Sequence, residues 1–237
     1  MLQYAFLLFA TALFSSQCSP AKSPSIDIDN SADASHKVYA KDTYPVSTYT
    51  KLNDLDKWET AVFAGGCFWC TEAAFERING VVDVISGYSG GIEEYPDYYS
   101  VGKGKTGHAE AIYIYYDPSV ITYETLLEVL FVAHDPTTLN RQGPDSGEEY
   151  RSAIYYQSPQ EKVIIDNAIQ KVNDSGYYKN KIVTEVASYN EFWVAEEYHQ
   201  NYYELNPNQG YVVNVSRPKV KKVLKAFPEL IKTKYKS

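Results

Sequence analysis

Two cysteines lie three residues apart, directly after a pair of glycines, in the sequence GGCFWC at residues 65–70. An apolar segment of β type, residues 60–63, precedes this sequence, and residues 73–78 have a helical composition. The spacing predicts a tight strand-to-helix turn with Cys67 in the first turn of the helix. Free N–H groups and the dipole at a helix N-terminus stabilise an anion, so we expect them to lower the pKa of the Cys67 thiol.

The second thiol, Cys70, is predicted on the same helix face as Cys67, one turn further along. There it can attack an oxidised Cys67 to form a disulfide. The Cβ atoms of such a pair are about 5–6 Å apart and a disulfide needs about 3.5–4.5 Å, so the first turn must loosen as the bond forms. The alternative is that both are buried small apolar residues, as most free cysteines are. We favour chemistry, because two of the three cysteines in the chain share one helical turn.

A thiolate that attacks an oxygen-bearing group also needs an acid to protonate the departing oxygen. Glu110 begins an apolar strand, and a period of two puts it on the face of Ile112 and Ile114. Burial on that face would keep a carboxylic acid protonated near neutral pH. Asp145 lies in a long loop and is the weaker candidate from spacing alone, because charged loop side chains are usually solvated.

The elements that must position these residues alternate imperfectly between strand and helix. Two strands follow each other near residues 82 and 112, which favours a two-layer α+β sandwich over a doubly wound parallel sheet. We therefore predict a mixed sheet with a ferredoxin-like core and long active-site loops at residues 87–107 and 134–150. Further strands are predicted at residues 81–86, 110–117, 151–156 and 182–187, and helices at 122–133, 158–173, 190–203 and in the basic tail from Ser216.

Composition divides the chain into three parts. Residues 1–18 have the apolar core of a signal peptide, residues 19–48 have the polar composition of a disordered tether, and residues 49–237 are long enough for one domain. We expect export to the periplasm or cell envelope. Cys18 is acylated, removed with the signal peptide, or retained unmodified, and acylation is the only membrane attachment that we expect. The net charge of −8, with basic residues clustered only near the end, argues against a nucleic-acid partner.

Six motifs occur in a fixed order between residues 52 and 210, and together they resemble the A-type peptide methionine sulfoxide reductases. The resemblance covers most of the predicted domain, and it rests on the order and spacing of all six. The motifs are GCFW at 66–69, GYSGG at 87–91, TGHAE at 106–110, RQGPD at 141–145, YRSAIY at 150–155 and AEEYHQ at 195–200.

The resemblance implies a role for each residue at a matching position. Cys67 matches the nucleophile that attacks the sulfoxide sulfur, and Glu110 the acid that protonates the sulfoxide oxygen. The groups that hold this oxygen and a water match Tyr98, Asp145 and Tyr150. The apolar pocket for the substrate methyl group matches Phe68 and Trp69, and His199 matches a motif position that supports the site from behind.

The resemblance also implies the substrate and the way the enzyme is regenerated. The family reduces the S epimer of methionine sulfoxide, free or in proteins, and needs no metal or organic cofactor. Many relatives carry Gly where this chain has Cys70, and place their resolving cysteines in a C-terminal tail. This chain has no cysteine after Cys70, which leaves Cys70 as the resolving candidate besides Cys18. Thioredoxin, or an exported equivalent, would then reduce the disulfide of a protein taken by default as a monomer.

Two other classes of function compete with this interpretation. A strand followed by C-x-x-C on a helix is also typical of thioredoxin-like disulfide oxidoreductases. That class would leave the motifs around Glu110, Asp145 and Tyr150 unexplained. A metal-binding module would need more soft ligands than two cysteines, and the four histidines show no ligand spacing.

Overall fold

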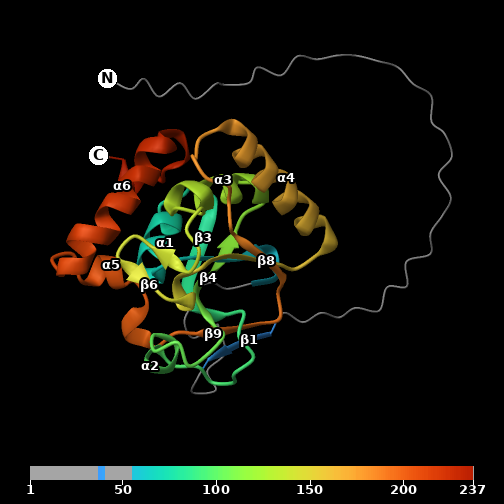
Figure 1. Ribbon diagram of the computed structural model, residues 1–237. Helices are drawn as coiled ribbons and strands as arrows, with labels where there is room; N and C mark the ends of the chain where they lie inside the picture. Colours follow the sequence, from blue (N-terminus) through green and yellow to red (C-terminus); the bar gives the residue numbers. More distant parts are fainter. Residues whose placement is uncertain (1–36, 41–54, 237) are drawn as a thin grey trace, which may run out of the picture. The chain divides into compact units, whose positions relative to one another are not determined.

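The computed structural model of the protein describes residues 37–40 and 55–236. Its centre is a mixed sheet of seven strands in the order β1-β9-β3-β4-β2-β7-β8 (Figure 1). The predicted signal peptide, Cys18 and most of the predicted tether lie outside the described residues. Among the residues that are described, no helix has the length and apolar character to cross a membrane.

Four central strands and two helices form the ferredoxin-like core that the sequence predicts. The strands β3, β4, β2 and β7 are neighbours in this order, and each strand is antiparallel to the next. Their order along the chain is β-α-β-β-α-β, as in ferredoxin-like folds. The elements are β2 (Glu59–Gly65), α1 (Phe68–Glu76), β3 (Val81–Ser89), β4 (Ala109–Tyr116), α3 (Tyr123–Ala133) and β7 (Ser152–Tyr156).

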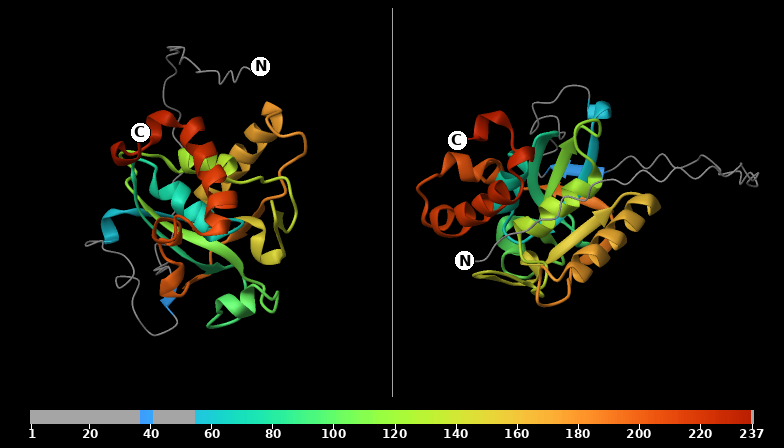
Figure 2. Two further views of the ribbon diagram at one scale, coloured as in Figure 1. Left: turned by 90° about the vertical axis from the view of Figure 1, so that its left-hand side faces the viewer. Right: turned by 90° about the horizontal axis from the view of Figure 1, so that it is seen from above.

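The helices cover one face of the sheet and share a single apolar cluster with it. Helix α3 lies between α4 (Pro159–Ser175) and α6 (Arg217–Ala226), and α6 also packs on α1 (Figures 1 and 2). The cluster joins Phe63 and Ile112 of the sheet to Leu126 of α3. A second cluster, with Val62 and Tyr113, fills the other face of the curled sheet. The core therefore fixes α1, and with it the two cysteines, against the sheet.

Predicted helix starts agree with the structure where a capping residue marks them. The Thr122 hydroxyl accepts a hydrogen bond from the backbone N–H of Thr125 at 3.2 Å and precedes α3. The Ser158 hydroxyl accepts one from Glu161 at 3.1 Å and precedes α4. Such bonds satisfy N–H groups that have no partner inside the helix.

The helix predicted at residues 190–203 is wrong. Residues Glu191–Val194 form strand β9, which pairs antiparallel with β3, and only a 3₁₀ turn at Glu197–His199 and the short helix α5 (Tyr202–Leu205) follow it. The bulky apolar residues of β9 gain more from pairing with β3 and from burial in the sheet than from helical spacing. On the outer side of β9 lies the parallel strand β1 (Lys37–Ala40), inside the segment predicted as a tether.

Strand β8 (Glu185–Ser188) is the opposite edge of the sheet and runs parallel to β7. The predicted strand at 182–187 therefore exists but begins later. The second predicted loop contains a two-stranded hairpin, β5 (Arg141–Gln142) and β6 (Asp145–Ser146), followed by a 3₁₀ turn (Glu148–Tyr150). The first contains the single-turn helix α2 (Tyr98–Val101).

Gly87 lies in β3 beside β9, where there is no room for a side chain. A Cβ at this position would lie 2.3 Å from the carbonyl oxygen of Trp193 and 2.4 Å from the ring of Phe192. We expect Gly87→Ala to lower the free energy of unfolding by about 1–3 kcal/mol, as overpacking does. Gly210→Ala is the matched control, because no heavy atom lies within 4 Å of its Cβ position. Equal stability of the two variants in urea denaturation would contradict this account.

Candidate active site

Cys67 lies in the turn between β2 and α1, as the N-cap residue immediately before the helix. Gly66 makes the turn with a φ of +81°, and a Cβ there would lie 2.5 Å from the side chain of Gln142. A residue other than glycine would therefore be strained and would clash. The Cys67 carbonyl accepts a hydrogen bond from the backbone N–H of Cys70 at 3.0 Å, which holds the two cysteines in one turn.

The pKa of Cys67 is raised, contrary to the sequence expectation. The main cause is burial, since the residue is 5 % exposed; Cys70 and the charge of Glu110 also raise the pKa. The first N–H of the helix, that of Phe68, donates to the Glu110 carboxyl at 3.0 Å. The first N–H of the helix therefore binds Glu110 and not the thiol. Burial raises the pKa of Cys67 more than the helix N-terminus lowers it.

Cys70 is the more acidic thiol of the two. A side-chain hydrogen bond from Cys67 lowers the pKa of Cys70 to about 7, and the charge of Lys219 and a hydrogen bond with Ser216 add to this effect against burial. The Cys70 sulfur lies 3.2 Å from the Ser216 hydroxyl. Because the two thiols are hydrogen-bonded, they titrate as a unit, and the first negative charge is held mainly at Cys70.

Glu110 is a buried carboxylic acid, 2 % exposed, at the start of β4. Burial raises the pKa of Glu110 to about 8, although the hydrogen bond from Phe68 lowers it; Asp145 raises it further. The acid is therefore protonated at neutral pH, as a proton donor must be. Its strand position puts it against the N-terminus of α1, on the predicted face.

Three polar residues from the two long loops surround this acid. Burial raises the pKa of Tyr98 and of Tyr150, and the charges of Glu110 and Cys67 raise it further. Asp145 interacts electrostatically with both tyrosines and accepts a hydrogen bond from the Tyr211 hydroxyl. The structure thus brings together Glu110 and the three polar residues that the resemblance assigns to the sulfoxide oxygen.

The apolar side of the site consists of Phe68 and Trp69. Phe68 is fully buried, and its ring lies 6.5 Å from that of Tyr98. The partly exposed Trp69 stacks on Tyr202, with ring centroids 3.8 Å apart, and its indole N–H donates to His199 Nδ1 at 3.1 Å. Burial lowers the pKa of His199 to about 4. His199 therefore accepts this bond as a neutral side chain and orients Trp69.

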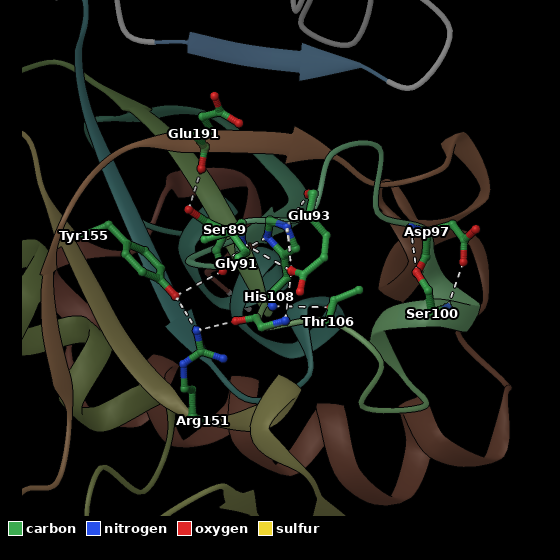
Figure 3. A network of polar contacts seen from close by, with 12 residues as sticks. Ser89, Gly91, Glu93, Asp97, Ser100, Thr106, His108, Arg151, Tyr155 and Glu191 are labelled. Atoms are coloured by element: carbon green, nitrogen blue, oxygen red, sulfur yellow. Dashed lines mark hydrogen bonds and ion pairs between the residues drawn. The ribbon is translucent and has the colours of Figure 1, made fainter.

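The loop that carries Tyr98 is tied down at both ends (Figure 3). The ring of His108 accepts from the N–H of Gly91 at 3.2 Å and bonds the carbonyl of Glu93 at 2.8 Å. Arg151 donates to the carbonyl of Gly107 at 2.9 Å. Asp97 and Ser100 close a capping box around α2. These bonds fix where the polar residues of the loop point.

Glu196 holds the same loop from the side of β9. One carboxylate oxygen accepts from the Tyr98 N–H at 3.1 Å, and the other from the Tyr88 hydroxyl at 2.9 Å. The motif that contains Glu196 is visible in the sequence, but its contact with Tyr98 depends on the pairing of β9 with β3, which the predicted helix concealed.

Sequence reasoning missed three residues of the C-terminal segment: Tyr211, Ser216 and Lys219. The Tyr211 hydroxyl is hydrogen-bonded with Cys67 and Asp145. Ser216 and Lys219 act on Cys70. Tyrosine is abundant in this chain, with 23 residues, so Tyr211 carries no local signal. The packing of α6 and of the π-helical turn before it on α1 brings this segment to the cysteines.

Comparison with known proteins gives a consistent result. A family model described as peptide methionine sulfoxide reductase matches residues 59–230. A peptide methionine sulfoxide reductase MsrA 1 from Rhodopirellula baltica is 51% identical over 73% of this chain and 90% of its own length. The MsrA of Natronomonas pharaonis is 48% identical over 73% of this chain and 97% of its own length.

Solved structures agree. The reduced form of Mxr1 from Saccharomyces cerevisiae is similar with a TM-score of 0.61 at 36% identity, covering 67% of this chain and 91% of that chain. Methionine sulfoxide reductase A of Corynebacterium diphtheriae has a TM-score of 0.58 at 34% identity, covering 65% of this chain and 77% of that chain.

The raised pKa of Glu110 makes stability depend on pH in a defined direction. The folded protein keeps this proton up to about pH 8, whereas an unburied glutamate loses it near pH 4.5. The contribution of the protonated acid is therefore complete below pH 4.5 and is lost as the pH rises to about 8. Gln does not titrate, so Glu110→Gln should gain stability relative to the wild type across this window, by on the order of a few kcal/mol.

Urea denaturation at a series of pH values measures this difference. Glu229→Gln, at an exposed position, is the control, and its difference from the wild type should not follow the same course. A Glu110→Gln difference that is independent of pH would show that Glu110 is ionised in the folded protein.

Proposed function

The chain belongs to the peptide methionine sulfoxide reductase family. From this premise we propose that Cys67 is the nucleophile with which this A-type enzyme reduces methionine sulfoxide. The observation that carries the assignment is the position of Cys67: a buried thiol next to a protonated acid, Glu110, and two tyrosine hydroxyls. A sulfoxide sulfur becomes electrophilic when its oxygen is protonated or hydrogen-bonded. A nucleophile and an acid on one small surface are what this reaction requires.

The first step transfers the oxygen atom from the substrate to the enzyme. Cys67 passes its proton along the hydrogen bond to the Cys70 thiolate and attacks the substrate sulfur. Glu110 gives its proton to the sulfoxide oxygen. The attack forms a bond between the Cys67 sulfur and the substrate sulfur, which now carries a hydroxyl group. The hydroxyl then passes to the Cys67 sulfur as both this S–S bond and the S–O bond of the substrate break, so that methionine leaves and Cys67 becomes a sulfenic acid. The methionine sulfur is reduced by two electrons, and the Cys67 sulfur is oxidised by two.

The residues around the acid hold the substrate in one orientation. We assign Tyr98, Tyr150 and Asp145 to the sulfoxide oxygen and an accompanying water, and Phe68 and Trp69 to the substrate methyl group. Polar groups on one side of the substrate sulfur and an apolar wall on the other distinguish its two epimers. This asymmetry fits an enzyme that acts on one epimer, which for the A-type family is the S epimer.

Cys70 then regenerates the nucleophile. It attacks the sulfenic acid of Cys67, a disulfide forms, and the oxygen leaves as water. The bond from the Cys70 N–H to the Cys67 carbonyl must open to bring the two sulfur atoms together. An exposed dithiol protein such as thioredoxin is the reductant we propose for this disulfide. A thioredoxin-like oxidoreductase is not favoured, because it would have no use for Glu110 and the tyrosines.

Turnover of the separate S and R epimers of a methionine sulfoxide peptide tests the proposed function. The wild type should turn over the S epimer repeatedly with thioredoxin, and Cys67→Ser should release no methionine. Cys70→Ser should release one equivalent and then stop, because its sulfenic acid cannot be resolved. Full multiple turnover by Cys70→Ser with thioredoxin would remove Cys70 from the cycle.

Glu110→Gln tests the proton donor separately. Gln cannot supply a proton, so the rate of methionine release in a single turnover should fall by about 10²–10⁴-fold. Binding of the sulfoxide peptide, measured by calorimetry in a Cys67→Ser background, should change far less. A wild-type rate in Glu110→Gln would show that another group protonates the oxygen.

A further inference from the structure

We propose that Ser216 and Lys219, in the C-terminal segment, form the site that stabilises Cys70 as a thiolate and keeps it ready to attack oxidised Cys67. Both residues act through the Cys70 thiol, so both are positioning residues. The inference rests on the proposed role of Cys70 as the resolving thiol. It assigns the catalytic contribution of α6, a helix that the sequence indicates only as part of a basic tail.

The contact between Cys70 and Ser216 is direct and buried. The two side chains lie 3.2 Å apart, and both residues are at most 2 % exposed. The Cys70 thiol donates in this bond when it carries its proton. When Cys70 is a thiolate, the Ser216 hydroxyl reverses and donates to the sulfur. A hydroxyl that can turn in this way satisfies both protonation states without moving the backbone.

Lys219 supplies the positive charge. Its ammonium nitrogen is buried and has no hydrogen-bond partner among the residues that the structure describes. A buried cation without a partner is costly, and an anion nearby offsets that cost. Ser216 and Lys219 are three residues apart across the junction of a π-helical turn (Val212–Ser216) and α6, and therefore face α1 together. Such turns are frequent at functional sites.

Among the charged groups that face Cys70 in the described part of the chain, Lys219 is the one that carries a positive charge. The titratable and charged groups that face the thiol are Cys67, Glu110, Asp145, Tyr211 and Lys219. Asp145 opposes a thiolate at Cys70, and Lys219 favours one. Glu110 and Tyr211 are neutral at pH 7, because burial raises the pKa of each. Removing Lys219 would therefore leave Asp145 unopposed.

The site supplies the Cys70 thiolate that takes the proton of Cys67 in the first step, and it acts again in the second step of the cycle. After methionine has left, Cys70 gives the proton it took from Cys67 to solvent and becomes a thiolate again. Its sulfur attacks the sulfenic sulfur of Cys67, an S–S bond forms, and the S–O bond breaks. The hydroxide that leaves takes a proton from solvent and becomes water. The Cys67 sulfur gains the one electron that the Cys70 sulfur loses.

The test follows disulfide formation in Lys219→Met, Lys219→Arg and Ser216→Ala, each in the full chain with Cys18→Ser so that only Cys67 and Cys70 react. One equivalent of the S epimer of methionine sulfoxide is added, and free thiols are counted with time at a series of pH values. Thiolate formation in the reduced proteins is titrated by ultraviolet absorbance. Lys221→Met is the control, on the exposed side of the same helix.

We expect Lys219→Met to move the midpoint of thiolate formation up by about one pH unit and to slow disulfide formation about tenfold below that midpoint. The slowing should disappear at high pH, where the thiol ionises without help. One equivalent of methionine should still be released. Lys219→Arg should restore most of the rate, Ser216→Ala should shift the midpoint in the same direction, and Lys221→Met should match the wild type.

A wild-type pH profile in both Lys219→Met and Ser216→Ala would overturn the inference. If Lys219→Met does not fold, Ser216→Ala still tests the inference. Its midpoint of thiolate formation either rises, which supports the inference, or stays at the wild-type value, which overturns it. Different results would overturn the role of Cys70 and the role of the thiolate site. No Cys67–Cys70 disulfide in the wild type would overturn the role of Cys70 itself, whereas a normal disulfide with unchanged pH dependence in the variants would overturn only the thiolate site.

Discussion

The hydrogen bond from the Phe68 N–H to the Glu110 carboxyl is the interaction on which the site depends. It joins the first residue of α1 to the start of β4, two elements that are 42 residues apart in the chain. It places the acid next to the turn that carries Cys67, and it also takes up the first free N–H of that helix. The proposed acid and the proposed nucleophile therefore share one helix N-terminus. Burial of both groups raises the pKa of each, which leaves Glu110 able to give a proton and shifts the negative charge of the thiol pair to Cys70.

Local patterns predicted most of the core, because there local preference and tertiary packing agree. The strand before Cys67, the cap at Thr122 and the cap at Ser158 each carry their own signal. Glu110 was placed on the correct strand face by the period of two alone. The segment at residues 190–203 failed because its apolar spacing fits a helix, whereas the edge of β3 requires a strand. No local pattern records a pairing partner more than a hundred residues away.

The sequence predicts part of the chemistry of the candidate site, because residue types are visible in it and contacts between distant segments are not. Residue types and motifs singled out the thiols, the acid and the polar loops. The pKa of Cys67 was misjudged because a helix N-terminus was considered without the carboxyl that binds to it. Tyr211, Ser216 and Lys219 were invisible because their importance comes only from the packing of α6 on α1. The residues that tune the thiols therefore come from the part of the chain with the weakest sequence signal.

Phe68 and Trp69, the apolar wall of the site, are also the two residues between the cysteines. When the disulfide closes, the backbone that carries both rings has to shift, and the stack of Trp69 on Tyr202 shifts with it. In the proposed cycle, the pocket proposed for the methyl group therefore differs between the reduced and the oxidised protein. Substrate and reductant consequently meet different forms of the enzyme, and the two half-reactions alternate as in a ping-pong scheme.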